Sequence, residues 1–140
     1  MNRPLIRIDR SIWLRGTGNG ELHRYADGME CCIGQACRQL GVPVYVLTGS
    51  TTVTDLLAAV HNGHTLTVPP QFIVDNPDYQ GQCHECGHEL ANDSELSKTQ
   101  SATVELAYSV NDDQGTTDAE KEEALVPLFN DMGLDVEFFN

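Results

Sequence analysis

The densest group of side chains that can do chemistry is the segment Cys83-His-Glu-Cys-Gly-His88. Two cysteines separated by two residues can place two thiolates on one Zn²⁺ ion, and a tetrahedral structural site needs four ligands. His88 lies in the same segment, and His61 and His64 are three residues apart near the end of an expected helix. The sequence therefore offers a candidate zinc site built from Cys83, Cys86, His88, His61 and His64.

The stretch around this motif predicts a long irregular loop. Residues 69–93 contain Pro69, Pro70, Pro77, Gly81 and Gly87, and long loops in compact domains are often functional or held by a metal. A redox dithiol is the alternative for the cysteine pair, but that motif expects a preceding strand and a following helix. Residues 69–82 do not predict such a strand, so zinc remains the favoured hypothesis and the dithiol the alternative.

Three further cysteines could act as nucleophiles. Cys32 and Cys37 fall on the apolar stripe of an expected helix over residues 29–40, and free cysteine is among the most buried residue types. Cys31 lies off this stripe, so it is the one thiol of the three to test for reactivity. A catalytic cysteine also needs a neighbouring base, so we favour a core or boundary role for all three.

Carboxylates are the second chemically distinctive group, and they are distributed unevenly. Residues 1–40 hold six arginines against four carboxylates, whereas residues 41–140 hold only Lys98 and Lys121 against seventeen. The net charge is −13. Such a surface repels nucleic-acid phosphate and anionic lipid and attracts basic proteins or cations. We therefore expect a basic protein partner, no direct nucleic-acid binding and no membrane binding.

The last part of the chain carries the clearest acidic features. The residues expected to contact a partner are Asp112, Asp113, Glu120, Glu122, Glu123, Asp135 and Glu137. Ordinary helix-start chemistry is the alternative, because carboxylates favour the positive end of a helix dipole. That alternative explains Glu120 well. It explains less well why lysine and arginine nearly disappear beyond Arg38.

The elements that must position these residues can be read from the apolar spacing. Strands are expected at residues 5–8, 42–47 and 134–138, and helices at residues 29–40, 53–60 and from 118 onwards. Residues 94–110 fit either a helix or an alternating strand, and the helix is favoured. Thr117 and Glu120 match a capping box, Gly133 suits a left-handed helix end, and Pro127 should kink or split the last helix. We predict a single α+β domain over residues 1–140, with three or four helices packed on a small sheet that pairs the first and last strands.

The composition also bears on location. No apolar run approaches about 18 residues, so no transmembrane segment is expected, and the N-terminus lacks a signal-peptide core. The five cysteines are an odd number, which disfavours a secreted disulfide framework. We expect an intracellular protein with free thiols or metal ligands.

Two strings near the N-terminus, Ile8-Asp-Arg-Ser-Ile-Trp13 and Asp27-Gly-Met-Glu-Cys-Cys-Ile-Gly34, resemble the opening of small proteins encoded by tailed bacteriophages. The C-terminal part resembles the same proteins in residues 110–113, 117–123, 128–129 and 133–138. The likeness covers both ends but not the middle, and Pro127 departs from it. The resemblance implies a bacteriophage origin and a location in the host cytoplasm, and it assigns no active site.

Three functional hypotheses follow. The first is a non-enzymatic interaction protein that binds, and inhibits, a basic nucleic-acid-binding or defence protein of the host. The second is a small zinc-stabilised module or metal-dependent enzyme that uses Cys83 and Cys86. The third is a structural component of the virion.

Overall fold

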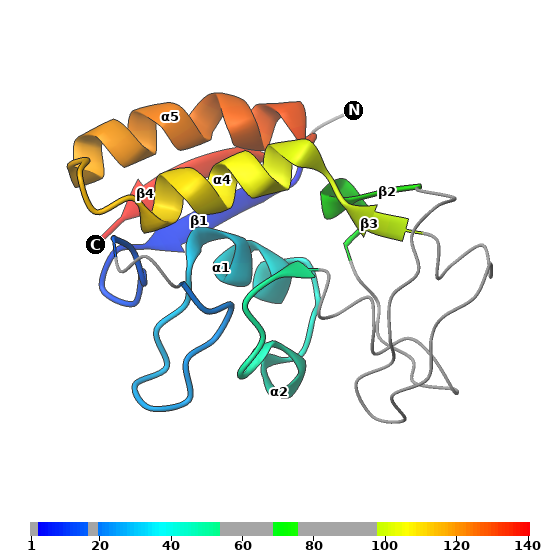
Figure 1. The fold of residues 1–140 in the computed structure, drawn as a ribbon, viewed down its shortest axis with the longest axis horizontal. Helices are drawn as coiled ribbons and strands as arrows, with labels where there is room; N and C mark the ends of the chain where they lie inside the picture. Colours follow the sequence, from blue (N-terminus) through cyan, green and yellow to red (C-terminus); the bar gives the residue numbers. More distant parts are fainter. Residues whose placement is uncertain (1–2, 17–19, 54–68, 76–97) are drawn as a thin grey trace.

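The computed structural model describes residues 3–16, 20–53, 69–75 and 98–140. Its elements in chain order are β1 (Leu5–Asp9), α1 (Cys32–Gln39), α2 (Val44–Leu47), the 3-10 helix η1 (Pro70–Phe72), β2 (Ile73–Asp75), β3 (Lys98–Gln100), α4 (Ala102–Asp112), α5 (Asp118–Asp131) and β4 (Asp135–Phe139). Figure 1 shows α4 and α5 running alongside each other, with β1 and β4 behind them. The predicted α+β class, helices packed on a small sheet, is confirmed.

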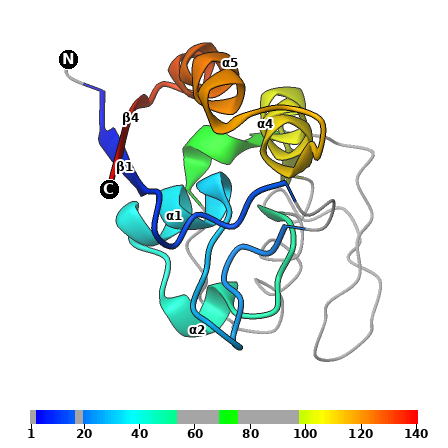
Figure 2. The same cartoon turned by 90° about the vertical axis from the view of Figure 1, so that its left-hand side faces the viewer.

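The first and last strands pair, as the sequence predicted, and the structure shows that they run parallel. The register runs from Leu5 opposite Asp135 to Asp9 opposite Phe139. Ile6 and Ile8 are buried, whereas Leu5 is exposed, so one face of the sheet covers the core and the other faces solvent. Figure 2 shows β1 and β4 at the left of the molecule, with α4 and α5 to their right. The pairing therefore joins the two ends of the described chain in one element.

Helix α1 is the buried helix of the fold. It begins after Cys31, whose Sγ accepts a hydrogen bond from the backbone N–H of Gly34 at 3.4 Å. It ends before Gly41, which has a φ of 108°. A Cβ atom at Gly34 would lie only 1.8 Å from the carbonyl oxygen of Leu22. Glycine is therefore required where these two backbones meet.

Helix α5 begins and ends as the sequence predicted. The Thr117 hydroxyl accepts from the Glu120 N–H and the Glu120 carboxylate accepts from the Thr117 N–H, which completes the capping box. Gly133 follows the helix with a φ of 80°. The prediction that Pro127 splits this helix is wrong, because α5 is continuous from Asp118 to Asp131. Pro127 lies on the exposed side of α5, where water can reach the carbonyl that its missing N–H leaves free.

One other local prediction is wrong, and a second is wrong in the part of its range that the structure describes. The predicted strand at residues 42–47 is instead the short helix α2, which follows Pro43 and buries Leu47 completely. The predicted irregular stretch at residues 69–93 begins with η1 and β2, and β2 pairs with β3 in an antiparallel ladder. The rest of that stretch, and the predicted helix beyond Val53, lie outside the described residues.

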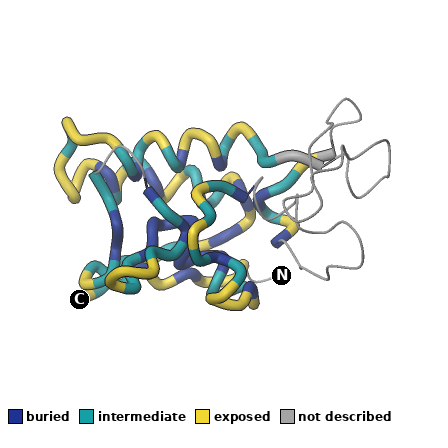
Figure 3. Tube along the Cα trace, turned by 60° about the horizontal axis from the view of Figure 1, so that its bottom comes forward, coloured by how far each residue is buried: buried dark blue, intermediate teal, exposed yellow. Residues whose placement is uncertain are grey.

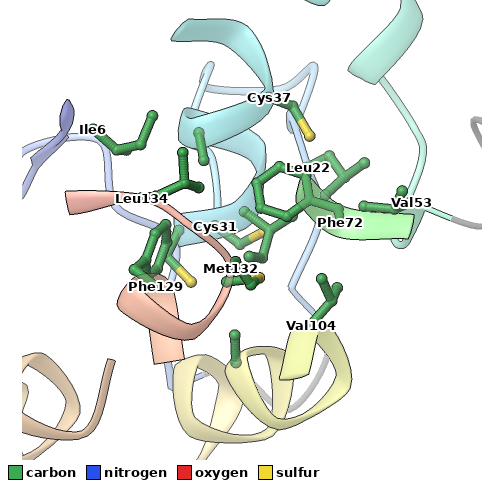
Figure 4. Close-up of a cluster of buried hydrophobic side chains, with 14 of the residues drawn as sticks. Ile6, Leu22, Cys31, Cys37, Val53, Phe72, Val104, Phe129, Met132 and Leu134 are labelled. Atoms are coloured by element: carbon green, nitrogen blue, oxygen red, sulfur yellow. The ribbon is translucent and has the colours of Figure 1, made fainter. Parts of the chain in front are cut away.

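A single buried cluster connects the described segments. It contains side chains from β1, α1, α4, α5 and the segment around Phe72. Phe72 is fully buried, and Figure 4 shows it directed into the same cluster as Leu22. The rings of Trp13 and Phe138 lie 5.2 Å apart, which adds an aromatic contact between the N-terminal segment and β4. No helix in the described part of the chain is both long and apolar enough to cross a bilayer.

Candidate interaction surface

Four arginines near the N-terminus form ion pairs with four carboxylates near the C-terminus. The pairs are Arg3–Asp135 at 3.7 Å, Arg7–Glu137 at 2.6 Å, Arg10–Glu122 at 2.7 Å and Arg15–Asp118 at 2.8 Å. The parallel pairing of β1 with β4 brings these distant parts of the sequence together. Lysine and arginine nearly disappear beyond Arg38, but four carboxylates of the C-terminal part are nevertheless paired with arginines of the N-terminal part.

Two of these pairs have the two-pronged geometry that guanidinium groups favour. The Arg10 Nε and Nη2 atoms donate to the two carboxylate oxygens of Glu122 at 3.0 and 2.7 Å. Arg15 binds Asp118 in the same way, at 2.9 and 2.8 Å. The Arg15 guanidinium lowers the pKa of the Asp118 carboxyl below its ordinary value. Glu122 and Asp118 therefore already have arginine partners within the protein.

Asp112 is also engaged within the fold. One of its carboxylate oxygens accepts from the Gly20 N–H at 3.2 Å, and the other accepts from Asn111 Nδ2 at 2.8 Å. Asp113, the next residue, is exposed and accepts a local bond from the Gly115 N–H at 2.8 Å. Of these two neighbouring aspartates, only Asp113 presents its carboxylate to solvent as a free charge for a partner.

A set of five exposed carboxylates remains on α4, α5 and the turn between them. We call this set the acidic helical face, and it consists of Glu105, Asp113, Glu120, Glu123 and Asp131. None of the five has an ion-pair partner among the described residues. Glu120 and Glu123 are three residues apart on α5, and Asp131 follows Glu123 by eight residues, so these three lie on the side opposite the buried Lys121, Leu125 and Phe129. Figure 3 shows such exposed positions recurring along the helical coils.

The only cation in α4 and α5 does not reach this face. Lys121 is 2% exposed, and its ammonium donates to the Thr116 carbonyl at 2.9 Å, to the Thr116 hydroxyl at 2.6 Å and to the Asp113 carbonyl. All three of its N–H donors are therefore satisfied by the α4–α5 turn. The buried lysine stabilises the turn and leaves the carboxylates on the outside unneutralised.

Two exposed apolar side chains lie among these carboxylates. Leu106 on α4 is 56% exposed and Val126 on α5 is 39% exposed. Leu106 follows Glu105 directly, and Val126 is three residues after Glu123, so each occupies the outward side of its helix. The acidic helical face therefore combines negative charge with apolar contact area.

The structure divides the predicted contact residues into three groups. Asp113, Glu120 and Glu123 belong to the acidic helical face. Asp112 and Glu122 are engaged in internal bonds, and Asp135 and Glu137 lie on β4 beside arginines. Sequence reasoning missed Glu105 and Asp131. Glu105 is next to Leu106, and Asp131 is eight residues after Glu123, so helical spacing would have placed both on the outward sides of their helices.

The predicted zinc ligands His61, His64, Cys83, Cys86 and His88 all lie outside the described residues. Within residues 3–16, 20–53, 69–75 and 98–140, no three side chains of the metal-ligating types come together in a way that could hold an ion.

The predicted core or boundary role of the three cysteines near the start of α1 is confirmed, and Cys31 is buried although it lies off the expected stripe. Cys31 is 2% exposed, and burial raises the pKa of its thiol to about 12. Burial also raises the pKa values of Cys32 and Cys37, as their positions on the apolar stripe predicted. Since the thiolate is the nucleophile, these three cysteines are suited to packing and to capping α1.

Sequence reasoning also missed a buried carboxylate, Glu30. Its side chain is 1% exposed and lies between His23, with Nδ1 at 3.0 Å, and Arg38, whose Nε donates at 2.9 Å. A carboxylate that orients a histidine is one part of a nucleophilic site. No hydroxyl or thiol in the described segments is hydrogen-bonded to His23, so this group fixes the loop at residues 23–30 to α1.

Comparison of the chain with protein-family models, with curated proteins and with solved structures found no match. The resemblance to bacteriophage proteins therefore remains a prediction from sequence. The function of the acidic helical face has to be inferred from the charges and contacts of its own residues.

Proposed function

We propose that this chain is a non-enzymatic interaction protein that binds a basic protein through the acidic helical face. The observation that carries the proposal is the contrast between two sets of carboxylates in the C-terminal part of the chain. Asp118, Glu122, Asp135 and Glu137 are paired with arginines, whereas the five carboxylates of the acidic helical face are exposed and have no ion-pair partner among the described residues.

A surface of this kind suits a protein partner with lysine and arginine side chains. Unneutralised carboxylates on two adjacent helices steer a basic protein towards the face and repel acidic ones. Leu106 and Val126 supply apolar contact within the same area, as the centres of protein interfaces generally do. Charge would then select the partner, and the apolar contact would hold it.

The partner proposed here is a nucleic-acid-binding or defence protein of a bacterial host. A row of carboxylates competes with phosphate groups for the same basic side chains, because both are anions that accept hydrogen bonds from arginine and lysine. Occupation of that surface would inhibit binding of nucleic acid. The sequence resemblance to bacteriophage proteins supports the choice of a host protein.

The proposal can be tested with two variants that change the net charge equally. Glu123→Gln/Asp131→Asn removes two charges from the acidic helical face. Asp9→Asn/Asp27→Asn removes two charges from segments outside α4 and α5. Each variant is immobilised beside the wild-type protein, exposed to bacterial lysate over a series of salt concentrations, and the bound proteins are identified by mass spectrometry.

We expect the wild-type protein to retain a basic protein that is released as salt screens the charges. The Glu123→Gln/Asp131→Asn variant should lose it, and the Asp9→Asn/Asp27→Asn variant should keep it. Equal loss by both variants would show that only the overall charge matters, and capture that is independent of salt and of the partner's charge would contradict the proposal.

A further inference from the structure

The two outer edges of the β1–β4 sheet differ in how their backbone groups are hydrogen-bonded. In a two-stranded sheet each strand pairs on one side only, so its alternate backbone N–H and C=O groups point away from the neighbour. Asp135 donates to the Pro4 carbonyl and Arg10 donates to the Phe139 carbonyl, each at 2.9 Å. By alternation, the backbone N–H and C=O groups of Arg7 and Asp9 point away from β4. The backbone groups of Val136 and Phe138 likewise point away from β1.

The outer edge of β1 is closed by two glutamines of α1. The Arg7 N–H donates to Gln39 Oε1 at 2.8 Å, and Gln39 Nε2 donates back to the Arg7 carbonyl at 2.7 Å. Gln35 makes the same pair of bonds with Asp9, at 2.8 and 3.2 Å. Each glutamine amide thus supplies the donor and acceptor that a residue of a third strand would supply.

The outer edge of β4 has no such closure. Among the described residues, no backbone or side-chain group bonds to the outward N–H or C=O of Val136 or Phe138. Their side chains are half-buried, which fixes the strand and keeps its outward groups in register. An unpaired strand edge of this kind is a template for an added strand. A parallel sheet of only two strands also gains from a third.

The charges beside this edge point to the occupant. Asp135 is paired with Arg3 and Glu137 with Arg7 of β1, and neither carboxylate has a second ion-pair partner among the described residues. An added strand would place its own side chains directly opposite these two carboxylates, where opposite charges stabilise the pair. A second copy paired through the full length of β4 would instead oppose carboxylates to carboxylates, between molecules that each carry a net charge of −13.

We infer that the outer edge of β4 binds an extended segment of another protein that carries lysine or arginine at alternate positions. This site is separate from the acidic helical face and does not depend on it. The added strand forms backbone hydrogen bonds to Val136 and Phe138, and its basic side chains lie beside Asp135 and Glu137.

Amide hydrogen exchange measured by NMR tests this inference on the intact protein. The probes are two eight-residue peptides, one alternating lysine and threonine and the other alternating glutamate and threonine. In the free protein, the Val136 and Phe138 amides should exchange quickly, and those of Arg7 and Asp9 slowly. At saturation, the lysine peptide should slow exchange at Val136 and Phe138 by at least about tenfold. It should also bind at least about fivefold more tightly than the glutamate peptide.

Two variants at one position separate edge pairing from other effects. Val136→Pro removes the outward N–H without removing a bond to β1, so it should abolish the added protection. Val136→Ala keeps the N–H and should retain that protection, which controls for the lost valine side chain. Circular dichroism confirms that each variant is folded before it is compared.

Three results would overturn the inference. Protection at Val136 and Phe138 that rises with protein concentration in the absence of peptide would identify a second copy as the occupant. Equal binding of the two peptides would remove the basic specificity. Peptide-induced shifts confined to α4 and α5, and lost in Glu123→Gln/Asp131→Asn, would place the peptide on the acidic helical face and leave the proposed function intact.

Discussion

Replacement of Asn111 by alanine should destabilise the protein more than any surface change. Asn111 is fully buried, and its Oδ1 atom accepts from Trp13 Nε1 at 2.7 Å and from the Cys32 N–H at 3.0 Å. Its Nδ2 atom donates to the Leu14 carbonyl at 2.9 Å. One side chain of α4 therefore binds both the N-terminal segment and the start of α1, which lie 79 to 98 residues earlier in the sequence.

The expected change in the free energy of unfolding follows from the buried polar groups that the substitution leaves without a hydrogen-bond partner. Asn111→Ala removes the partners of three polar groups, the Trp13 indole N–H, the Cys32 N–H and the Leu14 carbonyl. Each unsatisfied buried group costs about 1–3 kcal/mol, so the loss of three partners should lower the free energy of unfolding by about 3–9 kcal/mol. Domains of this size are stable by about 5–15 kcal/mol in total, so the variant should lose a large fraction of its stability.

Urea unfolding followed by tryptophan fluorescence measures this change, because Trp13 is the only tryptophan. Asn111→Leu is the matched control, since it fills the volume but makes none of the hydrogen bonds. If the bonds dominate, leucine should be about as destabilising as alanine. Asp112→Asn, which keeps an acceptor for Gly20, should change stability by less than about 1 kcal/mol.

The reasoning would be refuted by either of two results. A loss below about 1 kcal/mol in Asn111→Ala would mean that water replaces the amide at no cost. Wild-type stability in Asn111→Leu would mean that packing, and not hydrogen bonding, is what the asparagine supplies. An unchanged dependence on urea concentration is required for both comparisons, because it shows that the unfolding reaction is the same.

Three further predictions concern titration, thiol reactivity and metal content. The Arg24 guanidinium lowers the pKa of Asp27 from 3.8 to about 2. Because the pKa is lower in the folded than in the unfolded protein, this pair stabilises the fold above about pH 4, and the stabilisation is lost as the pH falls towards 2. NMR titration of Asp27 should show this pKa, and Arg24→Met should return it towards 3.8. In a Cys83→Ser/Cys86→Ser background, Cys31 and the other two cysteines should react with a thiol reagent only after unfolding, and rapid labelling of the native protein would contradict their burial. Elemental analysis of the unmodified protein should find zinc near one equivalent and much less in that double variant, and a content below about a tenth of an equivalent would exclude the zinc site.

Local signals in the sequence predicted local structure well. Thr117 and Glu120 predicted the start of α5 and Gly133 its end, because caps depend on neighbours within a few residues. Residues 42–47 failed because β-branched side chains favour strands only weakly. The burial of Leu47 after Pro43 decided in favour of a helix.

The candidate site was less predictable because it depends on distant contacts. Arg10 and Glu122 are 112 residues apart in the sequence, yet they form a paired guanidinium and carboxylate. Nothing local to Glu122 indicates that it is engaged, whereas the neighbouring Glu123 is exposed and belongs to the acidic helical face. Sequence alone could identify an acidic region, but it could not say which carboxylates the fold had already used.

The ion pairs also explain why the unneutralised charge is confined to one side. Exposed pairs such as Arg7–Glu137 contribute only about 0–1 kcal/mol each to stability, so their main effect is on the field around the molecule. They offset negative charge at the start of α5 and, more weakly because both partners of each pair are about half exposed, along β4. Lys121 is buried, and in the part of the chain that the structure describes no other cation pairs with the carboxylates on the outward sides of α4 and α5. The imbalance between the two parts of the sequence therefore becomes, in the folded protein, a polarity between the sheet side and the helical side.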